Sequence, residues 1–337
     1  TYEDVTNIDS VGVITARSNI KVGGSIEMTD GTTTINKHSV GVGTTTTAGR
    51  NAGVSTATGT LNFNTTLSAL EYYNGNKWVQ ITDSFFSVSG GTESTFGNYK
   101  LFTFTSNGTF TVTGSGNIDI LVVAGGGQGG LPAGNSNYGG GGGAGGLVWY
   151  TGFKVDAGDH SIVVGSGGAQ TSSGSGNRRG NDGANSTAFG LTALGGGGGG
   201  GQGGTAAGRN GGSGGGGGYP SGSGSATQPS QSNTLSSGSL VHNLGNNGGP
   251  GNNDPNGGGG GGGAGGTGFS GGSSVNGGAG FNMSALLGTS VGDSGWFAGG
   301  GGGSQQAGYS NFAGNNGGNG GGGNGDTYNS GNQTAGQ

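Results

Sequence analysis

The stretch that decides the fold is 118–124, which reads IDILVVA and runs without a break into 125–130, which reads GGGQGG. The first part is an almost continuous apolar run, as is typical of a β-strand buried on both faces. The second part carries almost no side chains. We therefore predict a fold in which β-strands pass directly into glycine segments.

Similar glycine runs follow along the chain, each made of several glycines, one small or amide residue and two more glycines. They lie at 139–146, 195–204 and 257–266 and form an internal repeat without a fixed period. One reading is a flexible linker. The other is a packed array of polyproline II-type helices, which rise about 3.1 Å per residue with three residues per turn.

We favour the packed array because the runs recur and because aromatic residues such as Trp149 and Phe189 lie between them. In such an array the backbone N–H and C=O groups of one helix pair with those of its neighbours. Only glycine permits a close approach on all sides, so we expect the occasional Ala or Gln to lie on an outer face.

The segments that flank the first glycine run read as strands. Phe102 and Phe104 share one face with Lys100, and Phe110 and Val112 follow after a turn. Further apolar runs lie at 147–150 and 160–164. This alternation predicts a small antiparallel β-sandwich.

The N-terminal region is rich in Thr, Val, Ile and Asn, with short β-type runs at 11–15, 25–29 and 61–64. Its clearest element is a hairpin of 69–73 and 77–81, because the Asn74-Gly75 pair suits a tight turn. The fold class expected is thus all-β with polyglycine II. The expected domains are a β-rich stalk (1–82), a linker (83–95), the sandwich (96–168) and a glycine-rich array with loops (169–337).

Composition excludes several classes of protein. The 337 residues include 97 Gly, 5 Pro and no Cys, which excludes collagen, disulfide scaffolds and thiolate metal sites. The net charge of −5 argues against a nucleic-acid partner, and no apolar run suits membrane insertion. With only 27% apolar residues, folding must draw on backbone hydrogen bonds, small cores or partner chains.

Catalytic candidates are few. The three histidines, His38, His160 and His242, lie in unrelated segments. Asp156 and Asp159 stand near His160, but this group reads as a polar turn that opens a strand rather than as an acid–base pair. We predict a protein that is not an enzyme, with no cofactor and no metal.

Aromatic and basic residues in the loops between glycine runs are candidates for surface recognition, since loops on a rigid scaffold often carry binding residues. The alternative is that they seal the flanks of the array, which we favour for the last two of the set. The candidates are Tyr138, Arg178, Arg179, Arg209, Tyr219, His242, Phe269, Trp296 and Phe297.

Two parts of the chain resemble bacteriophage proteins. Residues 2–17 (YEDVTNIDSVGVITAR), together with 59–64 and 70–78, resemble modules of tail-fibre-like structural proteins of marine bacteriophages, especially cyanophages. From Phe102 onward the chain resembles phage glycine-rich domains, with 121–127 (LVVAGGG) and the later glycine runs as the signature.

The resemblance implies a virion appendage that is a homotrimer and contacts other virion proteins. It also implies that loops of a polyglycine sandwich bind a host-surface glycan or outer-membrane protein. Family members end in a short apolar strand, so we expect the glycine-rich domain to be incomplete and the chain to be part of a longer one. The alternatives are a structural spacer or decorating fibre, an ice-binding polyglycine bundle and, less favoured, a lyase or glycosidase fibre.

Overall fold

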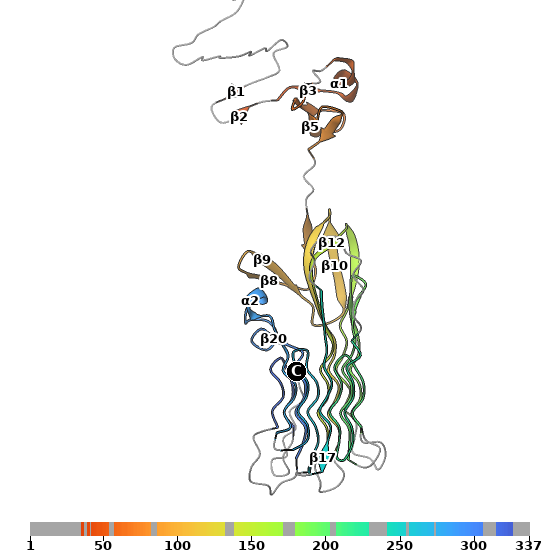
Figure 1. Cartoon of the computed structure of the whole chain (residues 1–337). Helices are drawn as coiled ribbons and strands as arrows, with labels where there is room; N and C mark the ends of the chain where they lie inside the picture. Colours follow the sequence, from red (N-terminus) through yellow and green to blue (C-terminus); the bar gives the residue numbers. More distant parts are fainter. Residues whose placement is uncertain are drawn as a thin grey trace, which may run out of the picture. The chain divides into compact units, whose positions relative to one another are not determined.

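The computed structural model divides the chain into two compact units, Thr1–Ser84 (unit 1) and Phe85–Gln337 (unit 2), which we describe separately (Figure 1). Outside the described residues lie the C-terminal residues 326–337 and both β-runs expected near the start of the chain, at 11–15 and 25–29. The described residues are 35–36, 39–40, 42–53, 57–81, 86–131, 138–170, 179–202, 207–228, 241–253, 256–272, 274–305 and 315–325.

Unit 1 is built on a four-stranded sheet with the order β3-β4-β5-β6, in which β3 runs parallel to β4 and the other pairs are antiparallel. Helix α1 lies between β3 and β4 in the chain, and β1 pairs with β2 separately. The elements are β1 (Ile35–Asn36), β2 (Ser39–Val40), β3 (Thr44–Thr45), α1 (Thr47–Gly53), β4 (Leu61–Asn64), β5 (Ala69–Tyr73) and β6 (Trp78–Gln80).

The predicted hairpin is confirmed by the antiparallel pairing of β5 with β6. Gly75 has a φ of 95°, a conformation that glycine adopts without strain. The side-chain oxygen of Asn74 accepts hydrogen bonds from the backbone N–H groups of Asn76 and Lys77, each at 2.9 Å. The local sequence therefore specifies this turn through both residues of the Asn-Gly pair.

The sheet of unit 1 has an inverted burial pattern. In β4, Asn62 and Asn64 are buried while Leu61 and Phe63 are exposed. Glu71 of β5 is also buried, and it accepts a hydrogen bond from Asn64 Nδ2 at 2.9 Å. This unit therefore buries polar side chains and leaves apolar ones at its surface.

Unit 2 begins with two packed antiparallel sheets, and the predicted β-sandwich is confirmed. The five-stranded sheet has the order β15-β14-β13-β10-β7, and the three-stranded sheet has the order β11-β12-β16. The strands are β7 (Ser87–Ser89), β10 (Gly108–Thr113), β11 (Gly116–Val123), β12 (Leu147–Val155), β13 (Gly158–Val163), β14 (Ser186–Ala188), β15 (Leu191–Ala193) and β16 (Val241–Leu244).

A single apolar cluster, the sandwich core, fills the space between these sheets. Phe110 and Val112 contribute from β10, and Val122 and Val148 contribute from the facing sheet. The ring of Phe110 meets that of Phe102 edge to face, with the centroids 5.6 Å apart. The alternating side chains of the predicted strands thus meet in one core.

The sandwich and the glycine segments belong to one unit in which strands and segments alternate along the chain. Strands β14, β15 and β16 come from within 169–337, yet they complete both sheets. The range 83–95, expected to be a linker, contains β7 and begins the hairpin of β8 (Thr92–Phe96) with β9 (Tyr99–Thr103). Glycine segments leave a sheet and return to it, so composition does not mark the boundaries.

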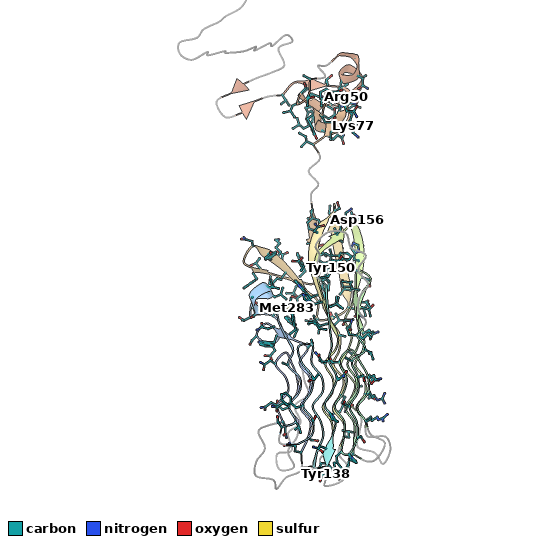
Figure 2. The ribbon with its side chains drawn as sticks, viewed as in Figure 1. Arg50, Lys77, Tyr138, Tyr150, Asp156 and Met283 are labelled. Carbon is teal, nitrogen blue, oxygen red and sulfur yellow. The ribbon has the colours of Figure 1, made fainter. Side chains whose placement is uncertain are left out.

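The three-stranded sheet is covered on its second face as well, as predicted for 118–124. Here Leu147 and Trp149 pack with Met283 in a second cluster, the cover cluster (Figure 2). Short elements that the sequence pattern did not predict supply this cover. They are β19 (Phe281–Asn282), α2 (Ser284–Leu287) and β20 (Trp296–Phe297).

The glycine segments run side by side away from the sandwich toward a far end marked by β17 (Asn252–Asn253), which pairs with β18 (Asn256–Gly257) (Figure 1). Gly140 and Gly143 donate to the carbonyls of Gly200 and Gly197 at 2.7 and 2.8 Å. Gly141 donates instead to Gly259, and Ala144, three residues on, to Gly262, both at 2.9 Å. One neighbour is thus contacted every third residue, the pattern that packed threefold helices predict.

Close backbone packing explains why glycine fills these segments. A Cβ atom on Gly140 would lie less than 3.0 Å from the carbonyl oxygen of Gly216, and one on Gly261 would meet that of Gly142 equally closely. Real Cβ atoms essentially never approach other atoms so closely. A side chain at these positions would therefore push two segments apart and break their hydrogen bonds.

The expectation that alanines would lie on outer faces is wrong for two of them. Ala144 and Ala264 are 3% and 2% exposed and belong to the cover cluster around Leu147 and Met283. They stand where glycine segments meet the sandwich, and there a methyl group fills apolar space. The alanines thus mark the junction between two kinds of packing.

Asn and Asp side chains complete the hydrogen bonding where a segment lacks a backbone neighbour. The Oδ1 atoms of Asn185, Asp182 and Asn247 accept the N–H groups of Gly195, Gly198 and Ala226 at 2.9, 2.8 and 2.7 Å. An unpaired buried N–H group is costly, so these side chains stabilise the edges of the array.

Candidate recognition surface

Two of the candidate residues come together at the far end of the glycine segments. The rings of Tyr138 and Tyr219 are tilted against each other with centroids 5.0 Å apart, and the Tyr219 N–H donates to the Tyr138 carbonyl at 3.1 Å. Figure 2 shows Tyr138 at the end of the glycine segments that lies away from the sandwich. Tyr138 is only 5% exposed, whereas Tyr219 is half-buried. Tyr219 is therefore the more accessible of this pair.

A clamp between two glycine segments holds this tyrosine pair in place. The N–H of Gly139 donates to the hydroxyl of Ser304 at 2.7 Å, and the N–H of Ser304 donates to the Gly139 carbonyl at 2.9 Å. Ser304 is itself buried. Because these bonds join segments that are 165 residues apart in sequence, the position of Tyr138 depends on the packed array.

The candidate arginines lie elsewhere. Arg209 forms an ion pair with Asp182 at 3.2 Å, and the two side chains are 36% and 43% exposed. The sequence pattern did not single out Asp182, which also accepts the N–H of Gly198 and so links the ion pair to the array. Arg179 is partly buried, and Arg178 lies outside the described residues.

Three candidates lie near the sandwich rather than at the far end. His242 stands in β16 opposite Trp149, and its ring centroid is 6.1 Å from that of Phe281. Phe281 is paired with Phe297 across the antiparallel strands β19 and β20, and Phe297 packs on the cover cluster. Trp296 is its neighbour in the chain. These contacts favour the sealing role for Phe297 over surface recognition.

Phe269 is an exposed candidate, with 52% of its surface open to solvent. Its backbone belongs to the array, because its carbonyl accepts the N–H of Gly260 and its own N–H donates to Asn276. The side chain therefore projects from an ordered segment of the array. The candidates do not form one continuous site.

The contacts of His160 are those of a structural residue. Its Nε2 atom lies 3.0 Å from the backbone carbonyl of Asp156, and its ring centroid is 5.0 Å from that of Phe189. Asp159 accepts a hydrogen bond from the hydroxyl of Thr111 at 2.7 Å. Neither carboxylate is therefore paired with the imidazole.

The described ranges contain no group of three His, Asp or Glu side chains placed to hold a metal ion. Neither helix in these ranges has the length and apolar character needed to cross a membrane.

Unit 1 carries an open hollow of about 480 Å³ that the sequence pattern did not indicate. The Arg50 guanidinium lies 5.9 Å from the centroid of the Trp78 ring and is ion-paired with Glu71 at 2.5 Å. The hollow thus combines aromatic, cationic and amide groups. Its lining residues are Arg50, Asn51, Tyr73, Asn76, Lys77 and Trp78.

Comparison with known proteins bears on unit 2. The family model of the glycine-rich domain matches residues 105–337, which is more than half of the chain. No match was found among curated proteins or among solved structures. The matched range covers most of the sandwich and all the glycine segments after it. The chain belongs to the glycine-rich domain family.

Proposed function

We propose that this protein is a non-enzymatic appendage on the exterior of a bacteriophage, assembled as a homotrimer and joined to other virion proteins. In this proposal the far end of the glycine segments contacts a glycan or an outer-membrane protein of the host. The sequence resemblance of 2–17 and 70–78 to phage fibre modules supports the origin.

The observation that carries the proposal is the way the array presents its far end. Segments from distant parts of the chain are joined by backbone hydrogen bonds and end together, away from the sandwich (Figure 1). A rigid scaffold reduces the entropy that surface residues lose on binding. Multiple copies of such an end on one particle would bind through avidity even if each contact were weak.

The test measures binding of the labelled full chain to a panel of marine bacterial cells and to an array of their surface glycans. Tyr219→Ala removes the accessible ring of the tyrosine pair. Tyr99→Ala is the matched control, because Tyr99 is 63% exposed in the β8–β9 hairpin outside the far end. We expect Tyr219→Ala to weaken binding about tenfold, as is usual for a well-placed aromatic contact, and Tyr99→Ala to leave it unchanged.

Two outcomes would contradict the proposal. Equal effects of both substitutions would show that the far end is not the binding surface. Absence of binding to every cell type and glycan would instead favour a structural spacer, for which the array supplies length and rigidity alone.

A further inference from the structure

The hollow of unit 1 lies on the polar face of the sheet, which carries Asn62, Asn64 and Glu71. Glu71 pairs with Asn62 across β4 and β5, and strand alternation places Tyr73 on the same face as Glu71. Tyr73 in turn pairs with Trp78 across β5 and β6, next to the Asn-Gly turn. The hollow therefore forms where helix α1 meets the turn end of the β5–β6 hairpin.

One wall of the hollow consists of side chains that the fold holds in place. The Arg50 guanidinium lies 5.9 Å from the centroid of the Trp78 ring and donates to Glu71 at 2.5 Å. The other carboxylate oxygen of Glu71 accepts a hydrogen bond from Asn64 at 2.9 Å. The rings of Tyr73 and Trp78 lie 5.5 Å apart and are inclined by 58°. A ligand would thus meet a preformed aromatic wall, which reduces the entropy lost on binding.

The hollow carries one positive charge that no described residue balances. Glu71 neutralises Arg50, and the two side chains are only 2% and 14% exposed. Lys77 is exposed and forms no ion pair with any residue that the structure describes. Its backbone N–H donates to the side-chain oxygen of Asn74 at 2.9 Å, which fixes the start of the side chain. In a chain with a net charge of −5, this local excess of positive charge favours an anionic ligand.

The other lining groups favour a sugar over a simple inorganic anion. Asn51 and Asn76 supply amide groups, which can donate to and accept from hydroxyl groups. Aromatic rings such as Tyr73 and Trp78 pack against the C–H face of a sugar ring, whereas a small inorganic anion gains nothing from them. The volume of about 480 Å³ is also that of a site for a small molecule.

We propose that the hollow of unit 1 binds an acidic saccharide. Its ring packs on the wall formed by Tyr73 and Trp78, its carboxylate or sulfate group pairs with Lys77, and its hydroxyl groups bond to the amides of Asn51 and Asn76. This site belongs to unit 1, whereas the proposed host contact belongs to unit 2. The inference therefore does not depend on the proposed function.

The first experiment titrates the full chain with four probes by isothermal calorimetry. An oligogalacturonate carries carboxylates and a sulfated dextran oligosaccharide carries sulfates. Methyl-esterified oligogalacturonate is the uncharged counterpart, and sodium sulfate supplies the anion without a sugar. We expect at least one acidic oligosaccharide to bind about tenfold or more tightly than the ester and the sulfate ion, and the tighter acidic probe identifies the acid group. Equal affinity for the ester or the sulfate ion, or no binding of either acidic probe, would overturn the proposal.

A pair of lysine substitutions tests the position of the site. Lys77→Gln removes the unbalanced charge from an exposed side chain, so we expect the fold to persist and the affinity for the acidic probe to fall about tenfold. Lys154→Gln is the matched control, because Lys154 is a 74% exposed lysine of unit 2. It should leave the affinity unchanged. Equal losses in the two variants would mean that the probe responds to overall charge, and the proposal would fail.

Tryptophan fluorescence supplies a readout that does not depend on charge. Of the three tryptophans, Trp78 lines the hollow, whereas Trp149 is 6% exposed and belongs to the cover cluster. Binding of the acidic probe should change the emission of the natural chain but not that of Trp78→Phe. A change that persists in Trp78→Phe would place the saccharide elsewhere on the chain and contradict the assignment.

Discussion

Units 1 and 2 meet the same shortage of apolar residues in opposite ways. Unit 2 gathers its apolar side chains into the sandwich core and the cover cluster, and beyond them it relies on backbone hydrogen bonds between glycine segments. Unit 1 buries only polar side chains among those described and leaves Leu61 and Phe63 exposed. A low apolar content thus does not dictate one burial pattern, because backbone pairing between glycine segments can take the place of a large apolar core in unit 2.

The comparison predicts that a destabilising substitution in one unit leaves the stability of the other unit unchanged. The largest loss of stability is expected at the buried ion pair of unit 1. Glu71→Ala would remove the ion-pair partner of Arg50 and one of the two acceptors of Asn64 Nδ2, and breaking a buried pair typically costs about 3 kcal/mol or more. Hydrogen exchange on the full chain should show unit 1 opening while the amides of unit 2 keep their protection.

The matched control is Glu93→Ala, which removes the exposed ion pair of Glu93 with Lys100 in unit 2. Exposed pairs contribute about 0–1 kcal/mol, so little change in exchange is expected. If Glu71→Ala were as mild as Glu93→Ala, the polar face of unit 1 would not be what holds its sheet together.

A smaller effect is expected for a methyl group inserted into the glycine array. Gly261→Ala places a Cβ atom against the Gly142 carbonyl, and overpacking of this kind costs about 2 kcal/mol. Thermal unfolding followed by circular dichroism should show a lower Tm for the transition of unit 2, with that of unit 1 unchanged.

Gly126→Ala controls for the loss of glycine itself. Its Cβ atom would lie 3.7 Å from the nearest carbonyl oxygen, which is ordinary contact. We expect its Tm to stay near that of the natural chain. Equal losses at both positions would mean that close approach is not the reason for glycine in these segments.

The smallest effect is expected at the edge of the array. Asn185→Ala leaves the N–H of Gly195 without its side-chain acceptor, at a cost of about 1 kcal/mol. The amide of Gly195 should exchange faster, as measured by nuclear magnetic resonance. Asn185→Asp keeps an acceptor oxygen and should restore slow exchange; if it did not, the side-chain bond would not protect this amide.

Local sequence patterns predicted much of the fold of both units. Alternating apolar residues identified the strands of the sandwich, and the Asn-Gly pair identified the hairpin of unit 1, because both signals lie within a few neighbouring residues. The cover by α2 and β20 could not be predicted, since short elements have weak patterns and are stabilised by contacts with Trp149 and Leu147.

The candidate surface was less predictable than the fold. Aromatic and basic residues were found by composition, but only packing brought Tyr138 beside Tyr219 and carried Phe297 to the cover cluster. The edge-capping Asn side chains had a signal in the frequency of Asn within the glycine-rich region, whereas Asp is rare there. Their partners lie on other segments, so their roles could not be assigned from spacing.

The sequence by itself determined the longer strands of the sandwich and the segments made mostly of glycine, because those properties depend on each residue's own side chain. Only the tertiary structure decided which glycine segments lie side by side. Every glycine offers the same N–H and C=O groups. The residues of one glycine segment therefore do not specify which other segment packs beside it. The neighbours are set by the positions at which glycine segments leave and enter the strands of the sandwich. For example, the segment that ends at Gly146 leads directly into β12 at Leu147.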